Sequence, residues 1–329
     1  MPVSQATRRR IVFLVFIALV LGFYRFRWGI LGLVNIGPLS QACENIEVLN
    51  TYLSTGGSPS AYLGRTPLIM CATEKENYEV VSKLIDLGVN VDAGKKRPYV
   101  PIIMDSSTGT TALDVSVRAG NFEITKLLFE NGANVNWADN VSASPLNLTI
   151  VYNRPEFLTL FLENENTIYE FDESRIVGAA LDGNLAIFRV LFEKGVHLER
   201  IHESALAGAA SKNHIQLVNF LYEQGISVDA KNSRTGQTAL HLPAKLNHVK
   251  MVEFLIDVKA DINVRDNRGN TPLHYAAMSN HDEVAKILVD NGADTNLENK
   301  KGKTPLEVSI ENDSWACETQ HPANCSRDH

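Results

Sequence analysis

The chain has 329 residues, of which 44% are hydrophobic and 21% are charged, a composition typical of folded proteins that excludes a largely disordered chain. Its formal net charge is −7, but the first 28 residues contain five arginines and no acidic residue, so the rest of the chain carries −12. Such an acidic body argues against nucleic acid as the partner, because phosphate binding requires a concentrated positive surface.

The N-terminus begins with a basic segment, residues 1–10, followed by an unbroken apolar run from residue 11 to residue 24. A helix of these 14 residues spans about 21 Å, which is shorter than a hydrocarbon core of about 30 Å. Arg25 and Arg27 can lengthen the span by reaching to the membrane interface, where Trp28 and its aromatic neighbours fit. We therefore predict a transmembrane signal-anchor helix at residues 11–28 and a linker at residues 29–40.

The excess of positive charge before this helix predicts a cytoplasmic N-terminus. Everything after Trp28 then lies outside, which places the body of the chain on the periplasmic side of a bacterial inner membrane. The first alternative is a cleaved signal peptide and a secreted body, because a basic segment before a short apolar run also fits a signal peptide. The second alternative is a buried or interfacial helix.

A recurring motif runs through the rest of the chain. It consists of Thr or Ser followed by Pro or Ala and then Leu, in full or degenerate form, with successive copies 45, 33, 30, 30, 34, 33 and 33 residues apart. The copies begin at Thr66, Thr111, Ser144, Ser174, Ser204, Thr238, Thr271 and Thr304. The copy at residues 271–277 reads Thr-Pro-Leu-His-Tyr-Ala-Ala. It resembles the ankyrin repeat, a family with a 33-residue period and the signature Thr-Pro-Leu-His-x-Ala.

This resemblance implies an all-α solenoid of helix-turn-helix repeats with β-turn fingers, preceded by the hydrophobic N-terminal helix. We place the ankyrin-repeat domain at residues 41–313, with a half-repeat cap at about residues 46–53, about seven repeats and a closing cap at residues 304–312. The spacing of 45 residues between the first two motifs indicates an insertion at residues 95–107. An irregular, cysteine-containing tail follows at residues 314–329.

Each repeat has recognisable helix-start and helix-stop residues. The Thr or Ser of the motif is predicted to cap the first helix, because its oxygen can accept a hydrogen bond from a free helical N–H. The second helices are predicted to end at glycines that adopt a left-handed conformation. These are Gly88, Gly132, Gly195, Gly225 and Gly292. Glu165 and Lys259 replace the glycine in two repeats, so we expect those two helices to fray or to be capped differently.

Five of the nine histidines recur because the repeat recurs. His241 and His274 hold the fourth place of the motif, and His214, His248 and His281 each follow an Asn at the turn between helices. Equivalent residues of neighbouring repeats lie about 10 Å apart, too far to share one zinc ion. No phosphate-binding loop, nucleophile motif or paired carboxylate motif is present in the sequence. We therefore predict no metal, no cofactor and no enzymatic activity, and we expect no small-molecule substrate.

The four cysteines bear on the compartment, because disulfides persist in oxidising environments. Cys317 and Cys325 lie in the tail, separated by seven residues, and we predict a disulfide between them if the domain is exported. Cys71 occupies the place of Ala276 in the most complete repeat, so we interpret it as a small buried thiol. A disulfide between Cys43 and Cys71 is the alternative.

Two regions are candidates for contact with a protein partner. The insertion combines basic charge with apolar residues, a pattern that often marks interaction sites. Its candidate residues are Lys95, Lys96, Arg97, Tyr99, Ile102 and Ile103. The alternative is a loop folded back on its own repeat. The later finger tips are also basic, with Lys231, Arg234, Lys300 and Lys301 beside the two candidates Arg265 and Arg268, which suggests an acidic partner surface.

The sequence therefore predicts a membrane-anchored ankyrin-repeat protein that mediates protein–protein interaction, with an exported repeat domain. An inhibitor or immunity-type module that neutralises one enzyme or toxin is an alternative within the same class. A cytosolic ankyrin scaffold is another, with the apolar segment inserted in reverse or resting on the membrane. A hydrolase or metalloenzyme hidden in the degenerate repeats is the rival from another class.

Overall fold

The computed structural model describes residues 36–64, 66–94, 110–136, 144–163, 169–196 and 202–311. The predicted anchor at residues 11–28, the insertion at residues 95–107 and the tail at residues 314–329 lie outside these ranges. Within the described residues, no helix combines the length and the apolar character needed to cross a membrane. The chain divides into two compact units, residues 1–148 and residues 149–329, which are described separately.

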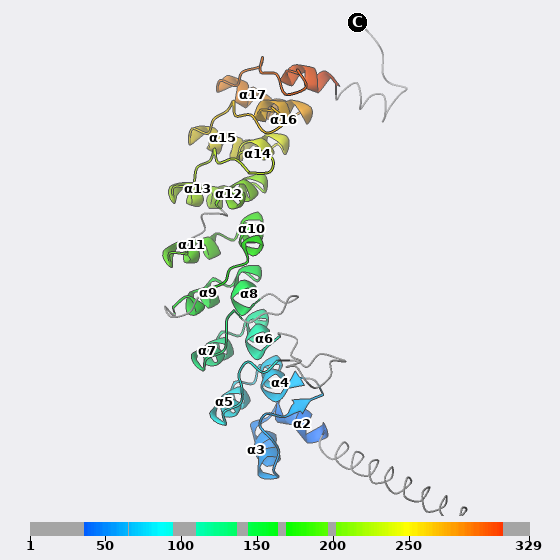
Figure 1. Cartoon of the computed structure of the whole chain (residues 1–329), viewed down its shortest axis with the longest axis vertical. Coiled ribbons are helices and arrows are strands. Elements are labelled where there is room, and N and C mark those ends of the chain that lie inside the picture. Colours follow the sequence, from blue (N-terminus) through cyan, green and yellow to red (C-terminus); the bar gives the residue numbers. More distant parts are fainter. Residues whose placement is uncertain are drawn as a thin grey trace, which may run out of the picture. The chain divides into compact units, whose positions relative to one another are not determined.

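The first unit consists of helix pairs and one short hairpin (Figure 1). In chain order its elements are α2 (Ile36–Ala42), α3 (Ile46–Ser54), β1 (Tyr62–Leu63), β2 (Thr66–Pro67), α4 (Leu68–Glu74), α5 (Tyr78–Asp86), α6 (Ala112–Ala119) and α7 (Phe122–Glu130); α8 (Pro145–Val151) begins at its end. Helix α4 packs on α5 and α6, and α5 packs on α3 and α7. The packing therefore runs between equivalent helices of successive pairs, as expected of stacked repeats.

Two predictions about the start of the array are wrong. Helix α2 occupies residues that we assigned to the linker at 29–40, and it packs on α3, so the array opens with a helix pair and not with a half-repeat. Thr66 does not cap α4, because β1 and β2 pair in antiparallel fashion with Leu63 opposite Thr66. A residue that precedes proline is biased toward extended backbone, and Pro67 itself has ψ 149°, so the helix begins only at Leu68. Among the described residues, the fold is thus helical with one added hairpin.

The second unit is a longer series of pairs (Figure 1). Its helices are α9 (Pro155–Phe161), α10 (Glu173–Leu181), α11 (Leu185–Glu193), α12 (His202–Ser211), α13 (Ile215–Glu223), α14 (His241–Lys245), α15 (Val249–Asp257), α16 (Pro272–Met278) and α17 (Asp282–Asp290), followed by a closing helical segment at residues 305–311. The first helices α10, α12, α14 and α16 pack in one row, and the second helices α9, α11, α13, α15 and α17 pack in another.

The core of this unit follows from residue size. The first helices meet through alanines that are fully buried, including Ala210, Ala244 and Ala276, and such small side chains permit close approach. The second helices bury larger residues at helical spacing, as Val284 and Leu288 do in α17. Burial of these apolar stripes is the main stabilising term of each repeat interface.

The predicted N-caps are confirmed at some repeats and wrong at others. Thr111 and Thr271 each accept a hydrogen bond from the backbone N–H three residues on. Ser174 does not cap α10, because Asp172 lies two residues earlier and its carboxylate accepts from the Ser174 N–H. Thr238 also precedes its helix, since α14 begins at His241. A stronger acceptor or a tight turn near the motif moves the start of the helix.

The glycine stops are confirmed. The expectation of a different helix end is wrong at Lys259, and Glu165 lies outside the described residues. Gly88, Gly132, Gly195, Gly225 and Gly292 all have φ between 67° and 96°. Lys259 has φ 68°, in the same left-handed region, and its N–H donates to the carbonyl of Ile256 at 2.9 Å. The next N–H, of Ala260, donates to Leu255 at 2.9 Å, as Ala293 does to Leu288 after Gly292. Helix α15 therefore ends with the same cap as its neighbours, because the hydrogen bonds and the burial of Ala260 hold the backbone in place.

Candidate functional site

The finger tips of the second unit carry basic side chains on turns that are held by backbone hydrogen bonds. We define the finger tips as residues 231–237, 264–270 and 298–303. Each tip closes on itself with a backbone hydrogen bond: Asn232 N–H to Gln237 O at 2.9 Å, Asp266 N–H to Asn270 O at 3.0 Å, and Asn299 N–H to Lys303 O at 2.8 Å. Each is thus a small hairpin-like turn.

Neighbouring tips are joined to one another. The Asn267 N–H donates to the carbonyl of Thr235 at 2.9 Å, and the Lys300 N–H donates to the carbonyl of Arg268 at 2.9 Å. Two glycines permit this approach. A Cβ atom at Gly236 would lie 2.8 Å from the Asn267 nitrogen, and one at Gly269 would lie 2.9 Å from the Lys300 nitrogen. Backbone hydrogen bonds therefore hold the three tips together as one row.

Asp266 organises the middle tip from inside. Its Oδ1 accepts from the N–H groups of Arg268 at 2.8 Å and Asn270 at 2.9 Å, and its Oδ2 accepts from the Tyr275 hydroxyl at 2.7 Å. The Gln237 amide donates to the same hydroxyl at 2.9 Å. Burial, together with the Asp266 carboxylate, raises the pKa of Tyr275 above its ordinary value. Asp266 is itself buried, so its carboxylate interacts with the turn and with Tyr275 and not with solvent.

The two arginines predicted as partner contacts have different roles. Arg265 donates through Nε to the carbonyl of Gly269 at 3.3 Å and through its terminal nitrogen to the carbonyl of Glu298 in the next tip. Arg265 therefore fastens two tips together. The Arg268 side chain is exposed and forms no hydrogen bond or ion pair within the described part of the chain.

Four of the five other basic residues of the tips divide in the same way. Lys231 donates to the carbonyl of Arg265 at 3.2 Å, which ties it to the middle tip. The exposed side chains of Arg234, Lys300 and Lys301 have no such bond among the described residues. We call Arg234, Arg268, Lys300 and Lys301 the basic finger row.

The histidines act as ties between repeats. The Nδ1 atom of His241 accepts from the Thr238 N–H at 3.0 Å, while its Nε2 lies 3.3 Å from the carbonyl of Asn270. Three further histidines follow left-handed Asn residues at the turns, and each Nε2 reaches a carbonyl of the preceding repeat. The pairs are His214 with Leu181 at 2.8 Å, His248 with Ser211 at 3.0 Å and His281 with Lys245 at 2.9 Å. These bonds account for the recurrence of histidine without a metal.

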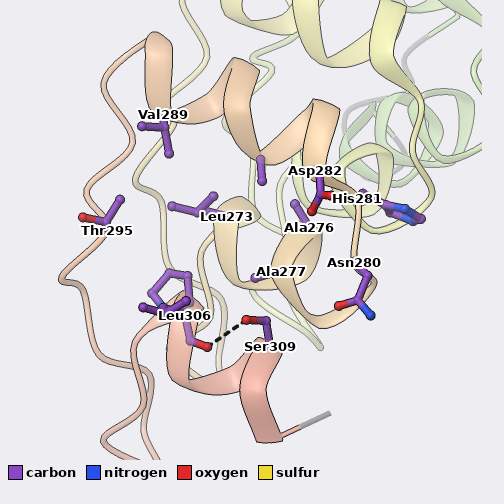
Figure 2. A pocket seen from close by; sticks show the side chains of 12 residues that line it. Leu273, Ala276, Ala277, Asn280, His281, Asp282, Val289, Thr295, Leu306 and Ser309 are labelled. Carbon is purple, nitrogen blue, oxygen red and sulfur yellow. Dashed lines mark hydrogen bonds between the residues drawn. The ribbon is translucent and has the colours of Figure 1, made fainter. Parts of the chain in front are cut away.

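A groove of about 480 Å³ lies at the C-terminal end of the described second unit. Leu306 and Ser309 of the closing segment face Leu273 and Ala277 of α16 across it (Figure 2). Leu306, which lines this groove, is 68% exposed.

Cys43 and Cys71 form a disulfide, with their Cα atoms 5.7 Å apart. Our interpretation of Cys71 as a free buried thiol is therefore wrong, and the alternative pairing is the one observed. Cys43 directly follows α2 and Cys71 lies in α4, so the bond fastens the first helix pair to the next repeat. Both residues are buried. The predicted pair Cys317 and Cys325 lies outside the described residues.

The six candidates of the insertion, Lys95, Lys96, Arg97, Tyr99, Ile102 and Ile103, also lie outside the described residues. Sequence reasoning missed the fastening role of Arg265. The sequence feature that could have indicated this role is the position of Asp266 between Arg265 and Arg268, because an Asp at a turn commonly orders the backbone around it.

Comparison with known proteins agrees with this geometry. The family model described as ankyrin repeats in three copies matches residues 34–139, 176–266 and 258–319, which is more than half of the chain. The chain belongs to the ankyrin-repeat family. Among solved structures it is similar to the ankyrin repeat domain of Bcl-3, described as a unique member of the IkappaB protein family. The two are 24% identical, the match covers 61% of this chain and 95% of that one, and the TM-score is 0.55, a likeness that shows the fold alone.

A comparison with curated proteins finds no match. Ankyrin-repeat proteins are typically non-enzymatic scaffolds that bind other proteins through the surface that their stacked repeats present. The family therefore agrees with the predicted class of function, and it carries no indication of catalysis.

Proposed function

We propose that this ankyrin-repeat protein is a protein-binding module displayed on the outer side of a membrane, with residues 11–28 as its anchor. Protein binding is the usual function of the fold, and the locked finger tips offer a preorganised surface for it. The anchor rests on the sequence: a basic segment, an apolar run and flanking aromatic residues.

The observation that carries the exported location is the Cys43–Cys71 disulfide. Disulfides persist in the periplasm and outside cells, whereas the cytosol of most organisms keeps thiols reduced. This bond joins two helices of the first unit and closes a loop of 28 residues. A structural disulfide in such a place supports folding in an oxidising compartment, which agrees with an N-terminus that stays inside and a repeat domain outside.

The topology can be measured directly in a bacterial host. Alkaline phosphatase fused to the C-terminus becomes active only outside the cytoplasm, and a green fluorescent protein fused there fluoresces only inside. We expect active phosphatase, a dark fluorescent fusion, and Cys43 and Cys71 protected from alkylation under denaturing conditions until a reductant is added. A fluorescent fusion with reactive Cys43 and Cys71 would contradict export and favour the cytosolic scaffold.

Two controls separate the remaining alternatives. Replacement of Ala18 by Arg interrupts the apolar run and should abolish phosphatase activity if that run directs export. Carbonate extraction and the mass of the purified protein distinguish an anchored chain from a cleaved and secreted one. An inhibitor or immunity-type module would be recognised by one-to-one capture of a target together with loss of that target's activity.

A further inference from the structure

The finger tips carry a local positive charge on an acidic protein. They contain seven basic residues and two acidic ones, in a chain whose net charge is −7. Asp266 is buried and accepts hydrogen bonds from two backbone N–H groups and the Tyr275 hydroxyl, so Glu298 is the one acidic side chain exposed on the described tips. The outward face of the tips is therefore basic.

The structure separates the cations that hold the tips together from those that face solvent. Arg265 and Lys231 donate to backbone carbonyls and belong to the scaffold. The basic finger row, Arg234, Arg268, Lys300 and Lys301, has exposed side chains that form no hydrogen bond or ion pair with another described residue. Charge without a local structural role is thus concentrated on three consecutive tips.

The row is held in a fixed arrangement. The backbone of Arg268 accepts from the Lys300 N–H at 2.9 Å, and the Arg234 carbonyl accepts from the Asn267 amide at 3.0 Å. The tips cannot separate to relieve repulsion between like charges without breaking these bonds. Because the backbone of the row is already ordered, binding of an opposite charge carries a smaller ordering cost here than in a flexible loop.

We infer that the basic finger row binds an acidic, extended segment of a partner protein. This inference rests on the proposed protein-binding function and names the chemistry of the partner. Stacked repeats place successive tips about 10 Å apart, and an extended chain in the polyproline II conformation rises about 3.1 Å per residue with about three residues per turn. Acidic side chains at every third residue therefore lie on one face of the segment, about 9 Å apart, and match the row. The acidic remainder of the protein repels such a segment and directs it to the tips.

The test uses the full chain in mild detergent and a fluorescein-labelled peptide of repeated Glu-Gly-Ser triplets, followed by fluorescence polarisation. The control peptide carries Gln in place of Glu. The positive charge of the basic finger row is removed by a quadruple variant that combines Arg234→Gln, Arg268→Gln, Lys300→Gln and Lys301→Gln. We expect this change to weaken binding of the Glu peptide by at least about tenfold, and an increase in salt from about 0.05 M to about 0.5 M to weaken it similarly.

The matched control removes four exposed lysines elsewhere in the same unit. Lys194→Gln, Lys212→Gln, Lys250→Gln and Lys286→Gln change the net charge by the same amount and should leave binding within about twofold. Equal binding of the Glu and Gln peptides, or equal loss in both quadruple variants, overturns the inference. Row-dependent binding to phosphatidylserine vesicles but not to the Glu peptide overturns it in favour of a lipid surface. Failure of the topology experiment does not affect this assay, which measures binding in purified protein.

Discussion

The Nε2 atom of His274 lies 3.0 Å from the carbonyl oxygen of Lys303, so an imidazole in the first turn of α16 holds the finger of the following repeat. The same ring accepts the Thr271 N–H through Nδ1 at 3.2 Å, which requires the neutral form with its proton on Nε2. His241 has the same arrangement one repeat earlier. In each of these two buried histidines, the hydrogen bond that Nδ1 accepts from the threonine N–H exists only while the ring is uncharged, whereas the bond from Nε2–H to the carbonyl of the following finger does not require the neutral ring.

Stability should therefore fall in mild acid. Burial lowers the pKa of both His241 and His274, and it outweighs the nearby Asp266 carboxylate, which acts in the opposite direction. Because the folded-state pKa values lie below the unfolded value of about 6.5, the stabilisation is complete above that pH and is lost as the pH falls through the folded-state values. Urea denaturation at several pH values measures this. The double variant His241→Gln and His274→Gln should be less stable than the parent at neutral pH, but its free energy of unfolding should fall less on acidification. An equal fall in both proteins would show that these two histidines do not cause the acid sensitivity.

Lys259 holds a conformation that favours glycine, so Lys259→Gly should stabilise the second unit by about 1 kcal/mol. Gly195 offers the reciprocal change, because its φ of 67° matches that of Lys259 and the space around its hypothetical Cβ is open. Gly195→Lys should destabilise by about 1 kcal/mol. Both are measured by urea denaturation followed by circular dichroism. Changes of the same sign in the two variants would show that backbone conformation does not dominate at these positions.

The Cys43–Cys71 disulfide should stabilise the first unit by roughly 3–4 kcal/mol, the chain-entropy value for a loop of 28 residues. Hydrogen exchange of the amides in α2 to α4 is the appropriate measurement, since repeat proteins open locally. The variant Cys43→Ala with Cys71→Ala is compared with the parent in a background in which Cys317 and Cys325 are Ser. Unchanged protection in α2 to α4 would exclude a stabilising role.

Arg265 and Arg268 should differ when each is replaced by Gln. Arg265→Gln removes bonds to two carbonyls and should cost about 1 kcal/mol, a value reduced for the exposure of the side chain. Arg268→Gln should change stability by less than about 0.5 kcal/mol. Urea denaturation and the exchange rate of the Lys300 amide report both effects. If Arg268→Gln costs as much as Arg265→Gln, the division between fastening and solvent-facing cations is wrong.

The groove beside the closing segment predicts a contrast between two leucines. Leu273→Ala should cost about 2–4 kcal/mol because this side chain is only 4% exposed. Leu306→Ala should cost less than about 0.5 kcal/mol, since Leu306 contacts solvent over most of its surface. Thermal and urea denaturation of the full chain measure both. A large cost for Leu306→Ala would show that the groove is covered.

Much of the repeat architecture was predictable because its determinants are local. The helix pairs, their glycine stops and the caps at Thr111 and Thr271 follow from residues within one turn of each helix end. Where the local prediction failed, a neighbouring group competed. Asp172 displaced Ser174 as a cap, and Pro67 held the backbone extended past Thr66.

By itself, the amino-acid sequence determined the repeat family, the positions of most helices and the presence of basic residues at the finger tips, because these depend on short-range patterns repeated along the chain. Only the tertiary structure decided that Cys43 bonds to Cys71, that Lys259 adopts the glycine conformation, and that Arg265 fastens two fingers while Arg268 faces solvent. Each of these depends on an atom contributed by a distant residue or by a neighbouring repeat, and the spacing of one sequence motif does not specify that contact.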